Sequence, residues 1–270
     1  MQDILKEINP ESISCYIEKN LDDFYIKSSE HPNFYSSGNE KVSWILAQNA
    51  DWPDGVFRVN FEHHNIKSEI RKIKDLIKNG ITPNAWTVGP LSKPKNLGLK
   101  LEKYGFSNVY HQAGMAVELK ELKIKPIEED KLIVQKIQDK HSLYQWADVV
   151  SDVFKLRVDF DHLNFLLLEK EAQFYVGYSE KNPVSALLLY LSSGVAGLHA
   201  VSTILEYRNR GFGLAISRAA LIDAFNMGFY VGVLQASSLG ERVYRKLGFQ
   251  KYCDIITYAL PDDLISKNSK

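Results

Sequence analysis

The first part of the chain alternates short apolar runs with turn-forming residues, a pattern that predicts strands joined by tight loops. Mainly apolar stretches at 42–48 and 56–61 lie on either side of the turn-like segment 51–55, which indicates a strand pair. An apolar residue then recurs every three or four positions, at Ile66, Ile70, Ile73 and Ile77. This spacing places the four side chains on one face of a helix. Gly80 lies just beyond and is a typical helix stop.

The pattern continues as strand, helix and strand up to a charged segment. Apolar character predicts strands at 86–88 and 109–119, with a short helix at 97–103 between them. Residues 120–131 are rich in Lys, Glu and Asp around Pro126, which is typical of a linker. We therefore place a boundary near residue 121, between a first domain at 1–120 and a second domain at 121–270.

The second half begins with one strand and two helices and continues with a meander. Residues 122–127 alternate as a strand does, and two helices are expected between 129 and 168. Three closely spaced apolar runs predict consecutive hairpins at 173–178, 184–191 and 195–203.

A helix opening at Gly211 follows the meander and should end at Gly228. Its expected inward residues are Leu214, Ala215, Ala219, Ile222 and Phe225. A strand at 230–236, a helix ending at Lys246 and a strand at 255–260 complete the chain. The expected fold is therefore a mixed α+β architecture with a mostly antiparallel sheet flanked by helices.

The two halves also resemble each other. When Gly105-Phe106 is laid on Gly248-Phe249, the predicted helices coincide and so do the strands before and after them. An internal duplication explains this match economically, giving two tandem halves of similar fold.

Composition and charge narrow the class of protein. The 33 basic residues balance the 33 acidic ones, so there is no electrostatic reason to expect nucleic acid or an anionic membrane as a partner. With only two cysteines, a disulfide framework and a four-cysteine zinc site are excluded, and no metal site is expected. The start of the chain lacks the pattern of a signal peptide, and no apolar run approaches the roughly 20 residues of a membrane helix. We expect a cytoplasmic protein of undetermined oligomeric state.

The segment 207–213, YRNRGFG, carries the clearest chemical signal. It lies between a predicted strand and a predicted helix, where glycines let the backbone approach a diphosphate and the N–H groups of the first helical turn point at it. The predicted binding residues are Arg208, Asn209, Arg210, Gly211, Phe212 and Gly213. The alternative is a tight turn with solvated arginines.

On these residues the chain resembles the GCN5-related N-acetyltransferase superfamily. The acyl-CoA signature of that family is matched in register by Arg208, Gly211 and Gly213, and ERVYRKLGF at 241–249 matches its closing helix. The resemblance covers most of 122–260 and implies a splayed sheet that holds acetyl-CoA as cosubstrate. It places the pantetheine arm between the strands ending at Thr203 and beginning at Tyr230. Further cofactor-binding residues are then expected at Val201, Ser202, Thr203, Ser237 and Ser238.

Acetyl transfer to an amine needs a base for the amine and an acid for the departing thiolate. Tyr244 matches the family's tyrosine, whose phenol of pKa about 10 stays protonated at neutral pH and serves as that acid. His199 is the candidate base, in a place similar to that of a histidine in one branch of the family. The alternative for Tyr244 is that it is an inward-facing residue of an amphipathic helix. The alternative for His199 is that it is a structural residue of its strand.

The resulting interpretation is an acetyl-CoA-dependent N-acetyltransferase that acts by direct transfer to a primary amine of a small molecule or peptide. The alternative is a non-catalytic acyl-CoA-binding sensor. In the first half Leu101 corresponds to Tyr244, and residues 62–70 contain no glycine where a diphosphate would approach. We therefore expect a degenerate first half that binds no acyl-CoA and instead shapes the acceptor site.

Overall fold

The structure is a computed structural model that describes residues 3–122 and 132–262. Within these ranges its α-helices are α1 (Ile13–Ser28), α2 (Ile66–Lys78), α3 (Leu97–Lys103), α4 (Lys140–Phe154), α5 (Phe160–Leu167), α6 (Phe212–Asn226) and α7 (Ser238–Leu247). Its strands are β1 (Phe34–Gly38), β2 (Ser43–Ala47), β3 (Gly55–Phe57), β4 (Trp86–Val88), β5 (Ser107–Glu118), β6 (Ile133–Lys136), β7 (Ala172–Ser179), β8 (Asn182–Ser192), β9 (Val195–Thr203), β10 (Val231–Ala236) and β11 (Gln250–Ala259). Two short 3₁₀ turns are η1 (Leu119–Glu121) and η3 (Leu205–Tyr207).

All the described strands form one sheet in the order β1-β2-β3-β4-β11-β5-β10-β9-β8-β7-β6. Neighbours are antiparallel except for β3 beside β4 and β9 beside β10, which are parallel. Alternate residues of β8 show the two faces: Leu187 packs with α6 and α7, whereas Leu188 packs with α4 and α5. The expected class, a mostly antiparallel sheet flanked by helices, is confirmed.

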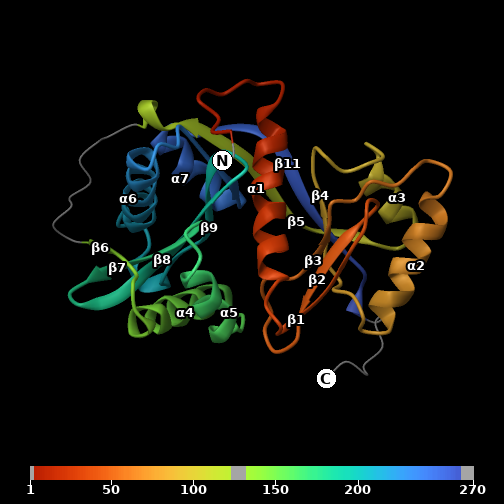
Figure 1. The fold of residues 1–270 in the computed structure, drawn as a ribbon, viewed down its shortest axis with the longest axis horizontal. Coiled ribbons are helices and arrows are strands. Elements are labelled where there is room, and N and C mark those ends of the chain that lie inside the picture. Colours follow the sequence, from red (N-terminus) through yellow and green to blue (C-terminus); the bar gives the residue numbers. More distant parts are fainter. Residues whose placement is uncertain (1–2, 123–131, 263–270) are drawn as a thin grey trace.

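The two halves of the chain interleave at the middle of this sheet. Strand β5 of the first half pairs with β10 of the second half, and β11 of the second half pairs with β4 of the first half. Strands β5 and β11 also pair with each other along most of their length. Helix α1 runs across this junction, between the second half on the left and the first half on the right (Figure 1).

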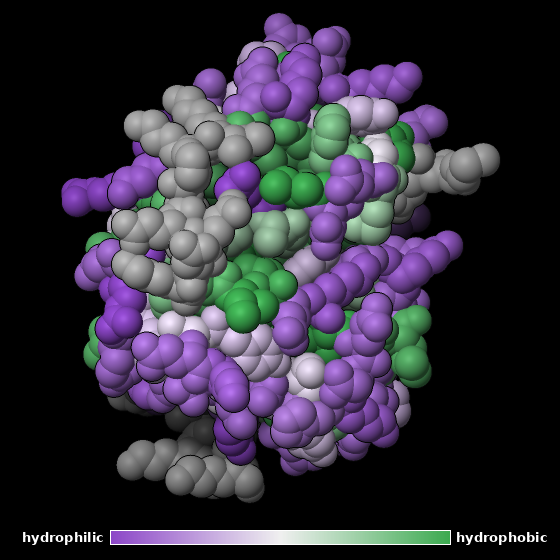
Figure 2. All heavy atoms as spheres, turned by 90° about the vertical axis from the view of Figure 1, so that its left-hand side faces the viewer, coloured by the Kyte–Doolittle hydropathy of each residue, from purple (hydrophilic) through white to green (hydrophobic). Residues whose placement is uncertain are grey.

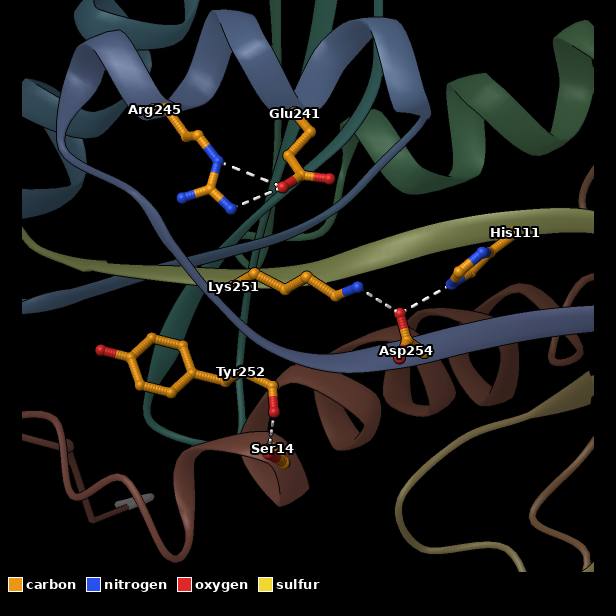
Figure 3. Close-up of polar contacts among 7 residues, drawn as sticks. All are labelled: Ser14, His111, Glu241, Arg245, Lys251, Tyr252 and Asp254. Carbon is orange, nitrogen blue, oxygen red and sulfur yellow. Dashed lines mark hydrogen bonds and ion pairs between the residues drawn. The ribbon is translucent and has the colours of Figure 1, made fainter.

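Polar contacts add to the backbone pairing of β11 (Figure 3). The Asp254 carboxylate lies 2.6 Å from Nε2 of His111 on β5, and Lys251 reaches the same carboxylate. The Ser14 hydroxyl of α1 donates to the backbone oxygen of Tyr252 at 3.3 Å. The side chains at the carboxylate are substantially exposed, so their contribution to stability is small beside that of the strand pairing.

Most elements predicted from the sequence are present with similar bounds. The four isoleucines of α2 are all buried, and Gly80 has the expected positive φ of 67°. Helix α1 and strands β1 and β6 are additions that the sequence pattern did not predict. The strand expected at 122–127 and the charged linker lie almost entirely outside the described residues. The domain boundary near 121 and the duplication stay predictions.

The predicted inward face of α6 is wrong. Its buried residues are Phe212, Ile216, Ser217, Ala220, Leu221 and Ala224, whereas Ile222 and Phe225 are 37% and 41% exposed. Helix α6 is apolar on most of its circumference, so spacing alone does not select the face that packs on the sheet. Apolar groups accordingly appear among polar ones on the side of the molecule that includes α6 (Figure 2). No helix in the described residues is long and apolar enough to cross a membrane.

The interleaved strands make a stability prediction at Gly114, where β5 meets β11 and α1. A Cβ atom added there would overlap Cys253 Sγ and press on Ile17. We expect Gly114→Ala to lower the free energy of unfolding by roughly 1–3 kcal/mol, as overpacking does. Urea unfolding of Gly114→Ala, Cys253→Ala and the double variant checks this, because removing Sγ should restore part of the loss. No recovery in the double variant would contradict the packing explanation.

Candidate active site

Strands β9 and β10 diverge, and the site lies where they separate. They pair only from Ala196 with Gly232 to Leu198 with Leu234, although β9 continues to Thr203. The register between β8 and β9 shifts beyond this point, and Ala200 takes a positive φ of 50°. A bulge of this kind bends its strand. Within the described residues, the side of β9 that faces β10 is therefore left without a strand partner beyond Leu198.

The phosphate-loop candidate follows the free end of β9. Gly211 has a φ of 83°, and α6 begins at the next residue without a side-chain cap. The N–H groups of the first turn of α6 are thus open to an anion. Arg208 Nε donates to the Thr203 oxygen at 3.0 Å, and the Arg210 guanidinium lies 5.0 Å from the Tyr207 ring centre. Both arginines are exposed and retain further N–H donors.

The other predicted loop and strand residues play distinct roles. The Phe212 side chain is buried beside Leu132 and Val184, so only its backbone is available to a ligand. Asn209 has a positive φ of 63° and shapes the turn. Ser202 is buried in β9, with its hydroxyl toward the Ala186 oxygen.

A cavity of about 500 Å³ opens beside the diverging strands. It brings together four of the predicted site residues: His199, Val201, Ser237 and Tyr244. Ser237 is the N-cap of α7, where its hydroxyl accepts from the Gly240 N–H at 3.2 Å, and Ser238 is exposed at the start of the helix. Arg208, Arg210 and the glycines lie outside the cavity lining, on the loop that leads away from it.

Much of the cavity wall comes from residues of the first half that the sequence motifs do not single out. Helix α1, the loop before β3, and strands β4 and β5 contribute Leu21, Phe24, Tyr25, Trp52, Asp54, Ala85, Thr87, Tyr110 and Gln112. The segment 51–55 was interpreted only as a turn, and α1 was not predicted. The sequence feature that could have singled out this segment is the presence of an aromatic residue, Trp52, and an acidic residue, Asp54, within the turn.

His199 is held by a buried amide from the other half. Asn20 of α1 donates through Nδ2 to the Tyr190 oxygen at 3.0 Å and lies 2.9 Å from the Ser192 hydroxyl. Its Oδ1 lies 2.9 Å from His199 Nε2. Because the Asn20 oxygen can only accept, Nε2 carries the hydrogen and the lone pair of the neutral ring is on Nδ1.

Burial controls the charge of both candidate catalytic side chains. It lowers the pKa of His199 to about 4, so the imidazole is neutral at pH 7. It raises the pKa of Tyr244, which therefore stays a proton donor. In the same cavity, the neutral imidazole can accept one proton and the protonated phenol can donate another. No group of three or more His, Cys, Asp or Glu that could hold a metal occurs in the described ranges.

Comparison with known proteins bears on the fold. No family model matches the sequence, and neither does any curated protein. The structure is similar to a GCN5-related N-acetyltransferase from Kribbella flavida, with a TM-score of 0.73 and 15% identity over 92% of this chain and 96% of that one. It is also similar to a GCN5-related N-acetyltransferase from Sphaerobacter thermophilus, with a TM-score of 0.63 and 14% identity over 97% and 98% of the two chains.

A third similar structure is a putative acetyltransferase of the same family from Novosphingobium aromaticivorans, with a TM-score of 0.52. Its identity is 14%, over 90% of this chain and 99% of that one. The chain has the fold of the GCN5-related N-acetyltransferases, as its motifs predicted. The similarity extends over both halves.

The buried histidine makes a prediction about stability and pH. An unfolded histidine has a pKa of 6.5, whereas burial holds that of His199 at about 4. Between these values the unfolded chain binds a proton that the folded protein does not, so stability falls as the pH falls. We expect acidification from pH 6.5 to 4 to cost the wild type up to about 3 kcal/mol more than it costs His199→Gln. Urea unfolding at both pH values measures this, and equal acid sensitivity would refute it.

Proposed function

We propose that this protein transfers an acetyl group from acetyl-CoA directly to a primary amine of an acceptor. The observation that carries the proposal is the separation of β9 from β10, which opens onto the cavity of His199 and Tyr244 beside the Gly211 loop. An acyl-CoA needs these three features together: a gap for its arm, N–H groups for its diphosphate and a chamber for its thioester.

The residues present fit this cosubstrate. The free side of β9 offers backbone groups of Val201 and Thr203 to the pantetheine arm, in the way a strand would pair. The Thr203 oxygen already accepts from Arg208, which fixes the arginine beside the start of α6. Arg208 and Arg210 supply positive charge for the diphosphate.

The chemistry follows from the two cavity side chains. Acetyl-CoA supplies a thioester whose carbonyl carbon accepts the amine. A new C–N bond forms and the C–S bond breaks, so the nitrogen loses a proton and the sulfur requires one. His199 takes the nitrogen's proton at Nδ1, directly or through water, and Tyr244 donates its phenolic proton to the sulfur.

The acceptor site belongs to both halves in this proposal. Helix α1 and the loop before β3 supply one wall of the cavity, which supports the expectation that the first half shapes the acceptor site. Leu101, the counterpart of Tyr244, is fully buried and has no proton to give. The first half is thus a partner in recognition rather than a second catalytic centre.

The diphosphate assignment predicts weaker binding for Arg208→Ala. Charge-assisted hydrogen bonds are each worth roughly 1.5–3 kcal/mol, so affinity for acetyl-CoA should fall about tenfold or more. Isothermal calorimetry provides the measurement. Arg71→Ala, at an exposed arginine of α2, is the matched control. One cosubstrate per chain is expected in the wild type. An unchanged affinity for Arg208→Ala would remove the loop from the site.

The acid assignment predicts a loss of turnover for Tyr244→Phe. The kcat should fall roughly a hundredfold while the affinity for acetyl-CoA is nearly kept, because the lost hydroxyl acts in the chemical step. Release of free CoA thiol across a panel of amines measures turnover, and Tyr35→Phe on exposed β1 is the control. Full turnover in Tyr244→Phe would exclude it as the acid, and acetyl-CoA binding without turnover on any amine would favour a sensor.

A further inference from the structure

The loop at 51–55 presents an acidic side chain to the cavity and is fastened in place. The Asp51 N–H donates to the Arg157 oxygen at 2.9 Å. The Asp51 carboxylate accepts from Arg157 three times, from N at 2.8 Å, from Nε at 3.1 Å and from Nη2 at 2.8 Å. Arg157 follows α4 in the second half, so the two halves clamp this loop between them. Trp52 and Asp54 are thereby held at the cavity wall.

Asp54 has no partner for its charge within the described residues. It is half-buried, and no hydrogen bond or ion pair in those ranges reaches its carboxylate. Burial, and then the negative charge of Asp51, raise the pKa of Asp54 to about 6, so the carboxylate is still mostly ionised at pH 7. The only basic side chain that lines the cavity in the described structure, His199, is neutral there. An uncompensated charge in such a place favours a cationic ligand.

Aromatic rings line the wall between Asp54 and the proposed reaction centre. The Phe24 ring stacks on Trp52 at 5.2 Å and on His199 at 5.1 Å, so the three rings form one row. Tyr25 lies at the Asp54 end, where burial and then the negative charge of Asp54 raise its pKa. Such a wall packs against the apolar body of a ligand.

The cavity is long enough to separate two functional groups of one ligand. It is lined by residues of the neighbouring strands β4, β11, β5, β10 and β9. With about 4.8 Å between paired strands, the distance from β4 to β10 alone is roughly 14 Å. Asp54 precedes β3 at the β4 end, whereas Tyr244 lies on α7, which packs on β10 and β5. A group bound at Asp54 is therefore distinct from an amine that reacts near Tyr244.

We propose that Asp54 binds a second, non-reacting ammonium group of the acceptor, so that the acceptor is an elongated molecule with two amine groups. This inference rests on the proposed function, because that function defines which end of the cavity reacts. Asp54 then positions the substrate and sets specificity, while His199 and Tyr244 carry out proton transfer at the other end.

The test compares two ligands that differ in their terminal groups. One is a linear diamine of about eight carbons, which spans roughly 10 Å, and the other is the diol of the same length, which has no ammonium group. Calorimetry on the protein, with and without CoA, measures both affinities at neutral pH. We expect the wild type to bind the diamine at least about tenfold more tightly, because only the diamine has an ammonium that can pair with Asp54.

Variants assign the preference to Asp54. Asp54→Asn should bind the two ligands equally, and Asp54→Glu should keep the preference for the diamine. Asp152 is an exposed carboxylate on α4, and Asp152→Asn is the matched control that should behave as the wild type. Equal binding of the two ligands by the wild type, binding of neither, or a preference that survives in Asp54→Asn would each overturn the inference.

The two proposals fail in different ways. A preference for the diamine that depends on Asp54, without CoA release from acetyl-CoA, would reject the acetyltransferase and keep the cation site. CoA release that is equally efficient, by kcat/KM, with the diamine and with the amino alcohol of the same length would keep the acetyltransferase and reject the cation site, because the single amine of the amino alcohol must react and leaves Asp54 without an ammonium.

Discussion

Strand β5 is hydrogen-bonded on one side to β10 and on the other to β11, and the rest of the structure depends on this double pairing. It joins the two halves of the chain into one sheet, and residues of both halves line the cavity beside this sheet. Without β5, strands β10 and β11 would each lose a neighbour, and the floor of the cavity would be interrupted. The second half therefore shares its sheet with the first half, although it carries the candidate phosphate loop and both proposed proton-transfer groups.

The site combines an opened sheet with two ionisable side chains whose charges are suppressed by burial. The bulge near Ala200 separates β9 from β10. His199, the residue before Ala200, contacts Asn20 and Phe24. Because Asn20 belongs to α1, the tautomer of the histidine is set by the half of the chain that lacks the acyl-CoA motif. The first half thus contributes to the proposed chemistry as well as to the shape of the cavity.

The sequence predicted the elements whose apolar residues fall on one face, and the motif that opens α6. Helix α2 is the clear case, since its four isoleucines are separated from polar residues around the helix. Helix α1 was missed because Glu18, Asn20 and Asp22 occupy buried positions, which breaks the apolar pattern. The proposed role of Asp54 could not be predicted, because it depends on the contact between Asp51 and Arg157, which are 106 residues apart in the sequence.

The order in which the strands are made differs from the order in which they lie. Strand β11, next to the centre of the sheet, is the last of the described strands in sequence. As the chain leaves the ribosome, β4 and β5 emerge long before the strand that fits between them. Until β11 arrives, both expose unpaired backbone groups that can pair with other nascent chains. This strand order favours dependence on chaperones during synthesis, even if the completed fold is stable.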